Sequence, residues 1–99
     1  ETGGAYVTVS DDEILAAIPT LARGVGVFGE PAGATAYAGL VKAVSEGVIE
    51  SDARVVVLNT GNGLKDIASA MTAVDQVGTA ANYVEPDLED VKRVMQTLN

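Results

Sequence analysis

The run Val55-Val56-Val57-Leu58 constrains the fold of this chain more than any other feature. As a strand, it would present aliphatic side chains on both of its faces. Strands of this kind occur in parallel sheets, where other strands flank them and helices cover both faces. We therefore expect Arg54–Leu58 to be a strand of a sheet that is larger than this chain alone can build.

A second strand is predicted at Tyr6–Ser10, where the residues alternate and favour β structure. Ser10 and Glu13 match a capping box, in which each side chain accepts a hydrogen bond from the backbone N–H of the other residue. The helix that follows is expected to be kinked or interrupted at Pro19. Its predicted end lies at Gly24–Gly26.

Three further helices are expected along the rest of the chain. Glu30-Pro31 predicts the start of the first of them, because proline suits a first helical turn, and Gly47 predicts its end. A short helix is predicted at about Leu64–Met71, and the stretch Ala73–Val84 is expected to be irregular. Pro86-Asp87 predicts the start of the last helix.

The expected order of elements is therefore β-α-α-β-α-α, which indicates an α/β fold. Two strands make a poor sheet, so the chain is predicted to be a fragment of a larger, mostly parallel sheet with helices on both faces. Residues 1–99 form one segment without internal repeats. The alternative is a small domain that oligomerisation stabilises.

The composition removes several kinds of chemistry from the chain. It contains neither cysteine nor histidine, which excludes disulfides, thiolate zinc sites and Ser-His-Asp or Cys-His catalysis by these residues alone. We therefore expect no metal site.

Charge and hydropathy narrow the range of partners. Fourteen acidic and six basic residues give a net charge of −8, and such a surface repels nucleic acid and anionic lipid. No stretch approaches the roughly 18 apolar residues of a membrane span, and no secretory pattern is visible. We expect neither nucleic acid nor membrane as a partner, and a cytoplasmic location. The chain begins at Glu1 and not at Met, so we expect a piece of a longer protein.

The first candidate site is Thr60-Gly61-Asn62-Gly63, which follows the predicted strand Arg54–Leu58. In open α/β sheets, ligands bind beyond the carboxyl ends of the strands. Glycines let the backbone approach a flat ligand, and a threonine hydroxyl can both donate and accept a hydrogen bond. The same residues also fit a plain strand-to-helix turn, and the pattern alone leaves both interpretations open.

The second candidate is Glu30, because a helix N-terminus followed by a glycine such as Gly33 can admit a ligand. From the chemistry of these residues alone, an ordinary helix start explains them better. Gly24, Gly26 and Gly29 match the dinucleotide pattern G-x-G-x-x-G. They follow a helix and not a strand, so we interpret them as a loop between helices.

The motifs Glu30-Pro-Ala-Gly-Ala34 and Thr60-Gly-Asn-Gly-Leu-Lys-Asp66 occur together, about one helix and one strand apart. Their combination resembles the C-terminal part of threonine synthases, which are pyridoxal-phosphate enzymes of the tryptophan synthase β-like fold (fold type II). The first motif is shared with serine and threonine dehydratases, and the second is more specific. Val9–Ile14 and Glu85–Leu88 also resemble this family, so the resemblance covers nearly the whole chain.

The resemblance implies a site for pyridoxal 5'-phosphate and places the chain in the C-terminal part of the large cofactor-binding domain. Thr60 would direct its hydroxyl at the pyridine nitrogen, and Glu30 would lie near the pocket. The turn beside the ring would be shaped by Gly61, Asn62 and Gly63. No residue here is assigned a catalytic role, because the Schiff-base lysine and the phosphate loop of the family lie upstream.

The function that the resemblance implies belongs to an enzyme that converts O-phosphohomoserine and water to threonine and phosphate. Its partners would be the rest of that enzyme and an amino-acid substrate, and the chain alone would be inactive. One alternative is a serine/threonine dehydratase or another pyridoxal-phosphate lyase. The alternative from another class is a non-catalytic module that self-associates into a homo-oligomer through exposed sheet edges.

Overall fold

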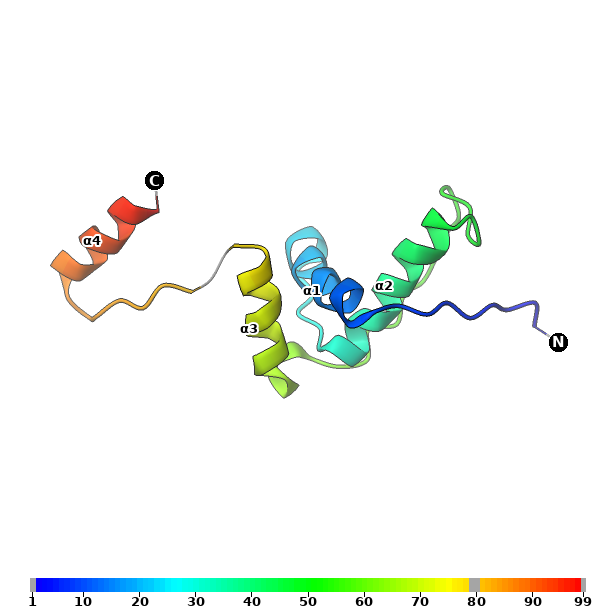
Figure 1. Ribbon diagram of the computed structural model, residues 1–99, viewed down its shortest axis with the longest axis horizontal. Helices are drawn as coiled ribbons and strands as arrows, with labels where there is room; N and C mark the ends of the chain where they lie inside the picture. Colours follow the sequence, from blue (N-terminus) through cyan, green and yellow to red (C-terminus); the bar gives the residue numbers. More distant parts are fainter. Residues whose placement is uncertain (1, 79–80, 99) are drawn as a thin grey trace.

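The computed structural model describes residues 2–78 and 81–98, and the regular structure in these residues is helical. The elements are α1 (Asp11–Val25), α2 (Pro31–Ser45), the 3-10 turn η1 (Gly63–Lys65), α3 (Ile67–Gln76) and α4 (Leu88–Thr97). The molecule is elongated, with extents of 64 × 26 × 21 Å. Helices α1, α2 and α3 form its body, and α4 lies at the end opposite the N-terminus (Figure 1).

Helix α1 begins as its sequence predicts. The Ser10 side chain accepts from the Glu13 N–H at 3.2 Å, and the Glu13 carboxylate accepts from the Ser10 N–H at 2.6 Å, which completes the capping box. The helix ends at Gly26, whose φ of 70° is left-handed. The predicted interruption at Pro19 is wrong, because α1 continues through this buried residue to Val25.

The later helices correct some predicted boundaries. Helix α2 begins at Pro31 as predicted, and Gly47 follows its end with a φ of 71°. The third helix begins at Ile67 and continues to Gln76, so the prediction of irregular chain over Ala73–Val84 is wrong for its first four residues. It is confirmed for residues 77–78 and 81–84, and residues 79–80 lie outside the described part of the chain. Tertiary packing explains why the helix extends past Ala73, because this residue is only 1% exposed and belongs to the core.

The core consists mainly of small side chains, which allow the helix axes to approach closely. Helix α1 packs against both α2 and α3. Its Ile18 and Leu21 are the largest buried core residues, and Ala34 of α2 is fully buried between the helices. The remaining buried members of the cluster are Ala17, Ala38 and Ala73.

The two predicted strands do not form a sheet in the described part of the chain. Residues 2–10 and 53–60 run as extended single chains, and the β pairing is limited to an antiparallel bridge between Gly29 and Asn62. The expected order β-α-α-β-α-α is therefore seen only in its helices. A strand forms through hydrogen bonds to a neighbour, and these two segments have no neighbouring strand among the described residues.

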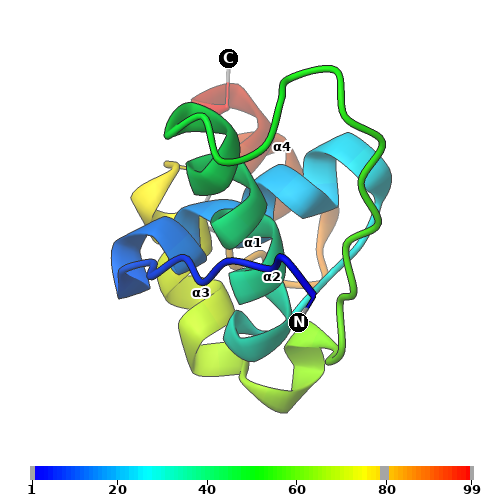
Figure 2. The same cartoon turned by 90° about the vertical axis from the view of Figure 1, so that its right-hand side faces the viewer.

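Both extended segments nevertheless lie along the same helix. Figure 2 shows the N-terminal segment crossing α2, while the segment before η1 runs alongside that helix. Ala5, Val7 and the run Val55–Leu58 line a groove of about 480 Å³ together with one side of α2. Val56 and Leu58 are 87% and 74% exposed, so this groove borders uncovered aliphatic surface.

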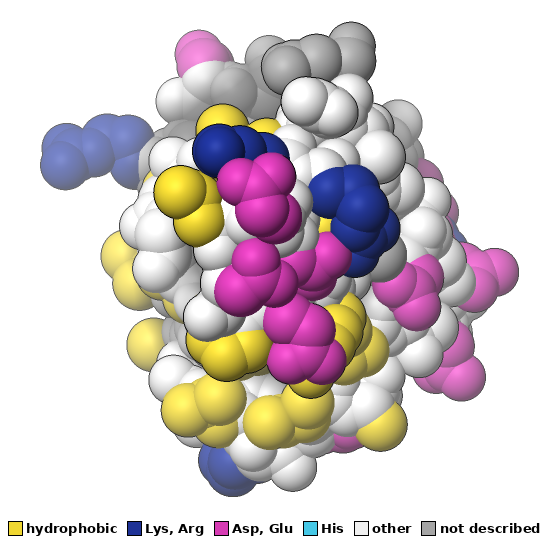
Figure 3. Space-filling view, turned by 90° about the vertical axis from the view of Figure 1, so that its left-hand side faces the viewer, with side chains coloured by type: hydrophobic (Ala, Val, Ile, Leu, Met, Phe, Trp, Pro, Cys, Tyr) yellow, Lys and Arg dark blue, Asp and Glu magenta, His cyan; other side chains and the backbone are white. Residues whose placement is uncertain are grey.

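Helix α4 carries charged and apolar side chains next to one another, as Figure 3 shows for this end of the molecule. Asp87 caps the helix, and Asp90 pairs with Arg93 one turn later. Hydrogen bonds from the Glu85 backbone N–H and from Arg93 hold the pKa of Asp90 below its usual value. Exposed apolar residues of this helix and its end are Leu88, Val91, Met95 and Leu98.

The core assignment is tested by shortening Ile18, which is 2% exposed. We expect Ile18→Ala to lower the free energy of unfolding by about 2–5 kcal/mol, because it removes buried methyl groups and leaves a cavity. Urea denaturation measures this change. The control is Val25→Ala at a 69% exposed position of the same helix, for which we expect a change within about 0.5 kcal/mol. Equal effects of both substitutions would contradict the assignment of the core.

Candidate functional site

The turn at residues 60–63 docks against the loop that leads into α2. The Glu30 N–H donates to the Gly61 carbonyl at 3.1 Å, and the Gly63 N–H donates to the Phe28 carbonyl at 2.9 Å. These two bonds form the bridge between Gly29 and Asn62. The two motifs that the sequence singles out therefore meet in space, although about 30 residues separate them.

Glycines permit this close approach. A Cβ on Gly33 would lie 3.2 Å from both the backbone N and O of Gly61 and would also strike the side-chain oxygen of Asn59. A Cβ on Gly29 would lie 2.6 Å from the same Asn59 oxygen. A Cβ on Gly61 would collide with the Glu30 carboxylate. These glycines are thus required by packing. Each lies in the junction, that is, the contact between residues 59–63 and the chain from Phe28 to Gly33, and faces another part of it.

The G-x-G-x-x-G match falls on the last turn of α1 and on the loop between α1 and α2. Gly24 lies within α1, and Gly26 forms its left-handed cap. Gly29 faces the side chain of Asn59. The interpretation as a loop between helices is therefore confirmed for Gly26 and Gly29, whereas Gly24 belongs to the helix.

Thr60 lies beside an open concavity of about 380 Å³. The lining residues are Val27, Phe28, Asn59, Thr60, Gly61 and Asn62. Thr60 is exposed, and within residues 2–78 and 81–98 its side chain makes no hydrogen bond. Its hydroxyl is therefore available to a ligand, next to a glycine backbone and the Phe28 ring. A threonine hydroxyl can both donate and accept a hydrogen bond to a ligand at this place.

Four of the five predicted site residues form a continuous turn, and the fifth packs on it. Asn62 accepts from the Leu64 N–H at 2.9 Å and thereby caps η1. Glu30 is the N-cap residue of α2 but makes no side-chain cap bond. Its carboxylate instead lies over Gly61 and pairs with Lys65 at 2.8 Å. This pairing of Lys65 was not predicted from the sequence, because no local spacing of residues signals it.

Asp66 fixes the end of the turn to α3. Its carboxylate accepts from the Ser69 backbone N–H at 3.0 Å and from the Ser69 hydroxyl at 2.8 Å. These bonds favour the charged form, so they lower the pKa of Asp66 below its usual value. The chain therefore passes from the turn into a capped helix.

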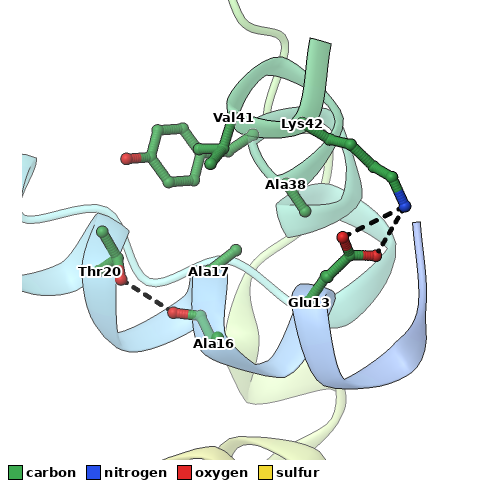
Figure 4. A pocket seen from close by; sticks show the side chains of 8 residues that line it. Glu13, Ala16, Ala17, Thr20, Ala38, Val41 and Lys42 are labelled. Atoms are coloured by element: carbon green, nitrogen blue, oxygen red, sulfur yellow. Dashed lines mark hydrogen bonds and ion pairs between the residues drawn. The ribbon is translucent and has the colours of Figure 1, made fainter. Parts of the chain in front are cut away.

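A second cavity lies between α1 and α2, away from the predicted site residues (Figure 4). Its volume is about 300 Å³, and small side chains such as Ala17 and Ala38 line it. The ion pair between Glu13 and Lys42, at 3.2 Å, closes one side. Hydrogen bonds from the Ser10 N–H and from Lys42 lower the pKa of Glu13. None of the five predicted cofactor residues lines this cavity.

The described residues contain neither a cluster of metal-binding side chains nor a helix suited to span a membrane. No group of three or more acidic side chains there is arranged to hold a metal ion. Among the same residues, none of the helices has the length and apolar character that a bilayer crossing requires.

Comparison with known proteins shows the family to which this chain belongs. Residues 1–61 match the sequence profile of the family described as "Pyridoxal-phosphate dependent enzyme". The match covers more than half of the chain and includes both Glu30 and Thr60. The chain therefore belongs to the family of pyridoxal-phosphate-dependent enzymes, whose members use that cofactor.

Several relatives of this chain are threonine synthases. The chain is 40% identical over 97 residues, or 98% of its length, to the threonine synthase of Methanocaldococcus jannaschii. It is 47% identical over 75 residues to that of Halalkalibacterium halodurans, and 52% identical over 66 residues to that of Methanosarcina acetivorans. These matches cover 76% and 67% of this chain. The matched regions span only 23%, 21% and 16% of the three relatives.

The junction predicts opposite effects for two glycines of α2. Gly33→Ala should lower the free energy of unfolding by about 1–3 kcal/mol, because the new methyl group collides with Asn59 and Gly61. Gly39→Ala should raise it by roughly 0.5–1 kcal/mol, because the space around this helical glycine is open. Thermal unfolding of both variants measures the difference. Stabilisation by Gly33→Ala would contradict the close junction.

The Asp66 cap predicts acid sensitivity of α3. Because the folded state lowers the pKa of this carboxyl, its stabilising effect is complete above its unfolded value, near 3.8, and is lost as the pH falls further. We expect amide exchange at Ser69 to accelerate below about pH 4, beyond the intrinsic pH dependence of exchange. Asp66→Asn should remove most of this excess acceleration. An unchanged pH profile in Asp66→Asn would show that another group causes it.

Proposed function

We propose that the chain is the C-terminal part of the large cofactor-binding domain of a threonine synthase-like enzyme. The observation that carries this proposal is the docking of the Thr60–Gly63 turn on Glu30, which brings the two family motifs together beside an open concavity that the turn lines. The identity to threonine synthases over 97 residues supports the particular assignment. The intact enzyme would act in the cytoplasm on O-phosphohomoserine and water.

The residues of the turn would hold pyridoxal 5'-phosphate by its ring. Thr60 would direct its unbonded hydroxyl at the pyridine nitrogen. A neutral hydroxyl does not enforce protonation of that nitrogen as a carboxylate would. Gly61 and Gly63 keep the backbone close to Glu30 and Phe28, and Asn62 fixes the start of η1. The carboxylate of Glu30 would border the ring without entering the concavity that Gly61 lines.

The cofactor, when bound, supplies an electron sink for carbanion steps of an amino-acid substrate. The contribution of this chain is binding and orientation. Thr60 and the glycine backbone would fix the plane of the ring, while the Schiff-base lysine and the phosphate loop would come from the remainder of the enzyme. The chain by itself would therefore be inactive.

The extended segments would be strands of the sheet that the family fold requires. Ala5, Val7 and residues 55–58 border one groove on α2, and Val56 and Leu58 are largely uncovered. Pairing with strands from the rest of the enzyme would satisfy their backbone groups and cover Val56 and Leu58. The rest of the enzyme is thus the principal proposed partner.

The proposed reaction is tested in the longer protein that the coding frame upstream of Glu1 specifies. We expect that frame to encode a Schiff-base lysine and a glycine-rich phosphate loop. The purified protein, loaded with cofactor, should release phosphate from O-phosphohomoserine. Absence of phosphate release, with ammonia release from serine or threonine in its place, would favour the dehydratase alternative.

Thr60→Val tests the role of the hydroxyl in that protein. The substitution keeps the shape of the side chain and removes one neutral hydrogen bond, so we expect cofactor affinity to fall by about two- to tenfold. The matched control is Thr72→Val on α3, whose hydroxyl bonds within its own helix to Ala68. Equal cofactor affinity in all three proteins would refute the contact with the ring nitrogen.

A self-associating module is the second candidate, and the uncovered apolar residues of α4 and of residues 55–58 favour it. Sedimentation of the 99-residue chain at several concentrations distinguishes the two. A concentration-dependent mass would support self-association, whereas a monomer throughout would remove this alternative.

A further inference from the structure

Lys65 follows the Thr60–Gly63 turn and contacts Glu30, and the proposed function assigns it no role. Its ammonium lies 2.8 Å from the Glu30 carboxylate. The Lys65 side chain is 62% exposed, whereas the Glu30 side chain is only 17% exposed. The lysine is therefore a solvated cation that reaches across the junction to a largely covered carboxylate.

The partner of Glu30 explains an anomaly at the start of α2. A side chain at an N-cap position usually accepts from the first backbone N–H groups of its own helix. Glu30 makes no such bond, although it precedes Pro31 at the helix start. Its carboxylate is turned toward the 60–65 turn instead, where it lies against Gly61.

This orientation adds a side-chain contact to the backbone hydrogen bonds of the junction. The Glu30 backbone N–H already donates to the Gly61 carbonyl, and the Gly63 N–H donates to the Phe28 carbonyl. With its carboxylate held by Lys65, Glu30 contacts the turn through both its backbone and its side chain. Thr60 precedes Gly61 directly, so the position of its backbone depends on this contact.

We propose that Lys65 is a positioning residue, which acts through Glu30 to hold the Thr60–Gly63 turn against the start of α2. The proposal rests on the proposed function for the meaning of the turn, but its geometry can be tested without the cofactor. The effect of Lys65 is transmitted by the Glu30 carboxylate alone, and this makes the two residues interdependent.

The test measures hydrogen exchange of the Glu30 and Gly63 amides in the full 99-residue chain. Lys65→Met removes the charge and keeps the length of the side chain, and we expect these amides to exchange about two- to fivefold faster. Lys65→Arg should restore the protection of the unsubstituted chain, because it restores the cation. The effect should weaken in high salt, since the lysine is exposed.

A double-substitution cycle tests whether Lys65 acts through Glu30. Glu30→Gln and Lys65→Met should each accelerate exchange, and the combined variant should be no faster than the faster single variant. Additive effects, or unprotected amides in the unsubstituted chain, would overturn the proposal. The matched control is Lys92→Met, which breaks an exposed pair with Glu89 on α4 and should leave both amides unchanged.

The link to the cofactor is tested with pyridoxine 5'-phosphate, which lacks the aldehyde and therefore cannot react with lysine amines. In the longer protein, Lys65→Met should weaken its binding about two- to fivefold, and Lys65→Arg should restore it. Unchanged affinity in Lys65→Met would overturn the positioning role. Absence of binding by the unsubstituted protein, with the exchange coupling present, would count against the proposed function and not against the coupling.

Discussion

The close contact between the 60–63 turn and the start of α2 is the interaction on which the candidate site depends. Two backbone hydrogen bonds make this contact, and both join residues more than 30 positions apart. Each bond requires that the two backbones approach without side chains between them, which Gly29, Gly33 and Gly61 allow. The concavity beside Thr60 is a consequence of this approach.

The helices of this chain pack against one another, whereas its extended segments lack partners within the described residues. Its helices find partners within the chain, because small residues such as Ala34 let α1, α2 and α3 pack closely. Its extended segments do not, because a strand needs a second strand for its hydrogen bonds. Several uncovered aliphatic residues lie on these segments and on α4, and others, such as Val25 and Val41, lie on the outer sides of the packed helices. Uncovered apolar surface of this extent agrees with a piece of a larger domain.

The sequence predicted the helices better than the strands, and the physical reason is the range of the interactions. The capping box of α1, the proline at the start of α2 and the aspartate before α4 are local signals, and all three helix starts were predicted correctly. The run Val55–Leu58 indicated a strand by its aliphatic character alone, but burial on both faces depends on partners that the described residues do not provide. The extension of α3 to Gln76 was missed because it depends on packing of Ala73.

For the site, the sequence by itself determined which residue types are present, the two motifs and the family to which they belong. It also determined that no histidine or cysteine is available within the chain. The tertiary structure decided that the Glu30 carboxylate pairs with Lys65 and leaves its own helix uncapped. It also decided that Asn59 packs against Gly29 and Gly33. Such contacts join distant positions, and their spacing in the sequence carries no periodic or local signal from which they could be predicted.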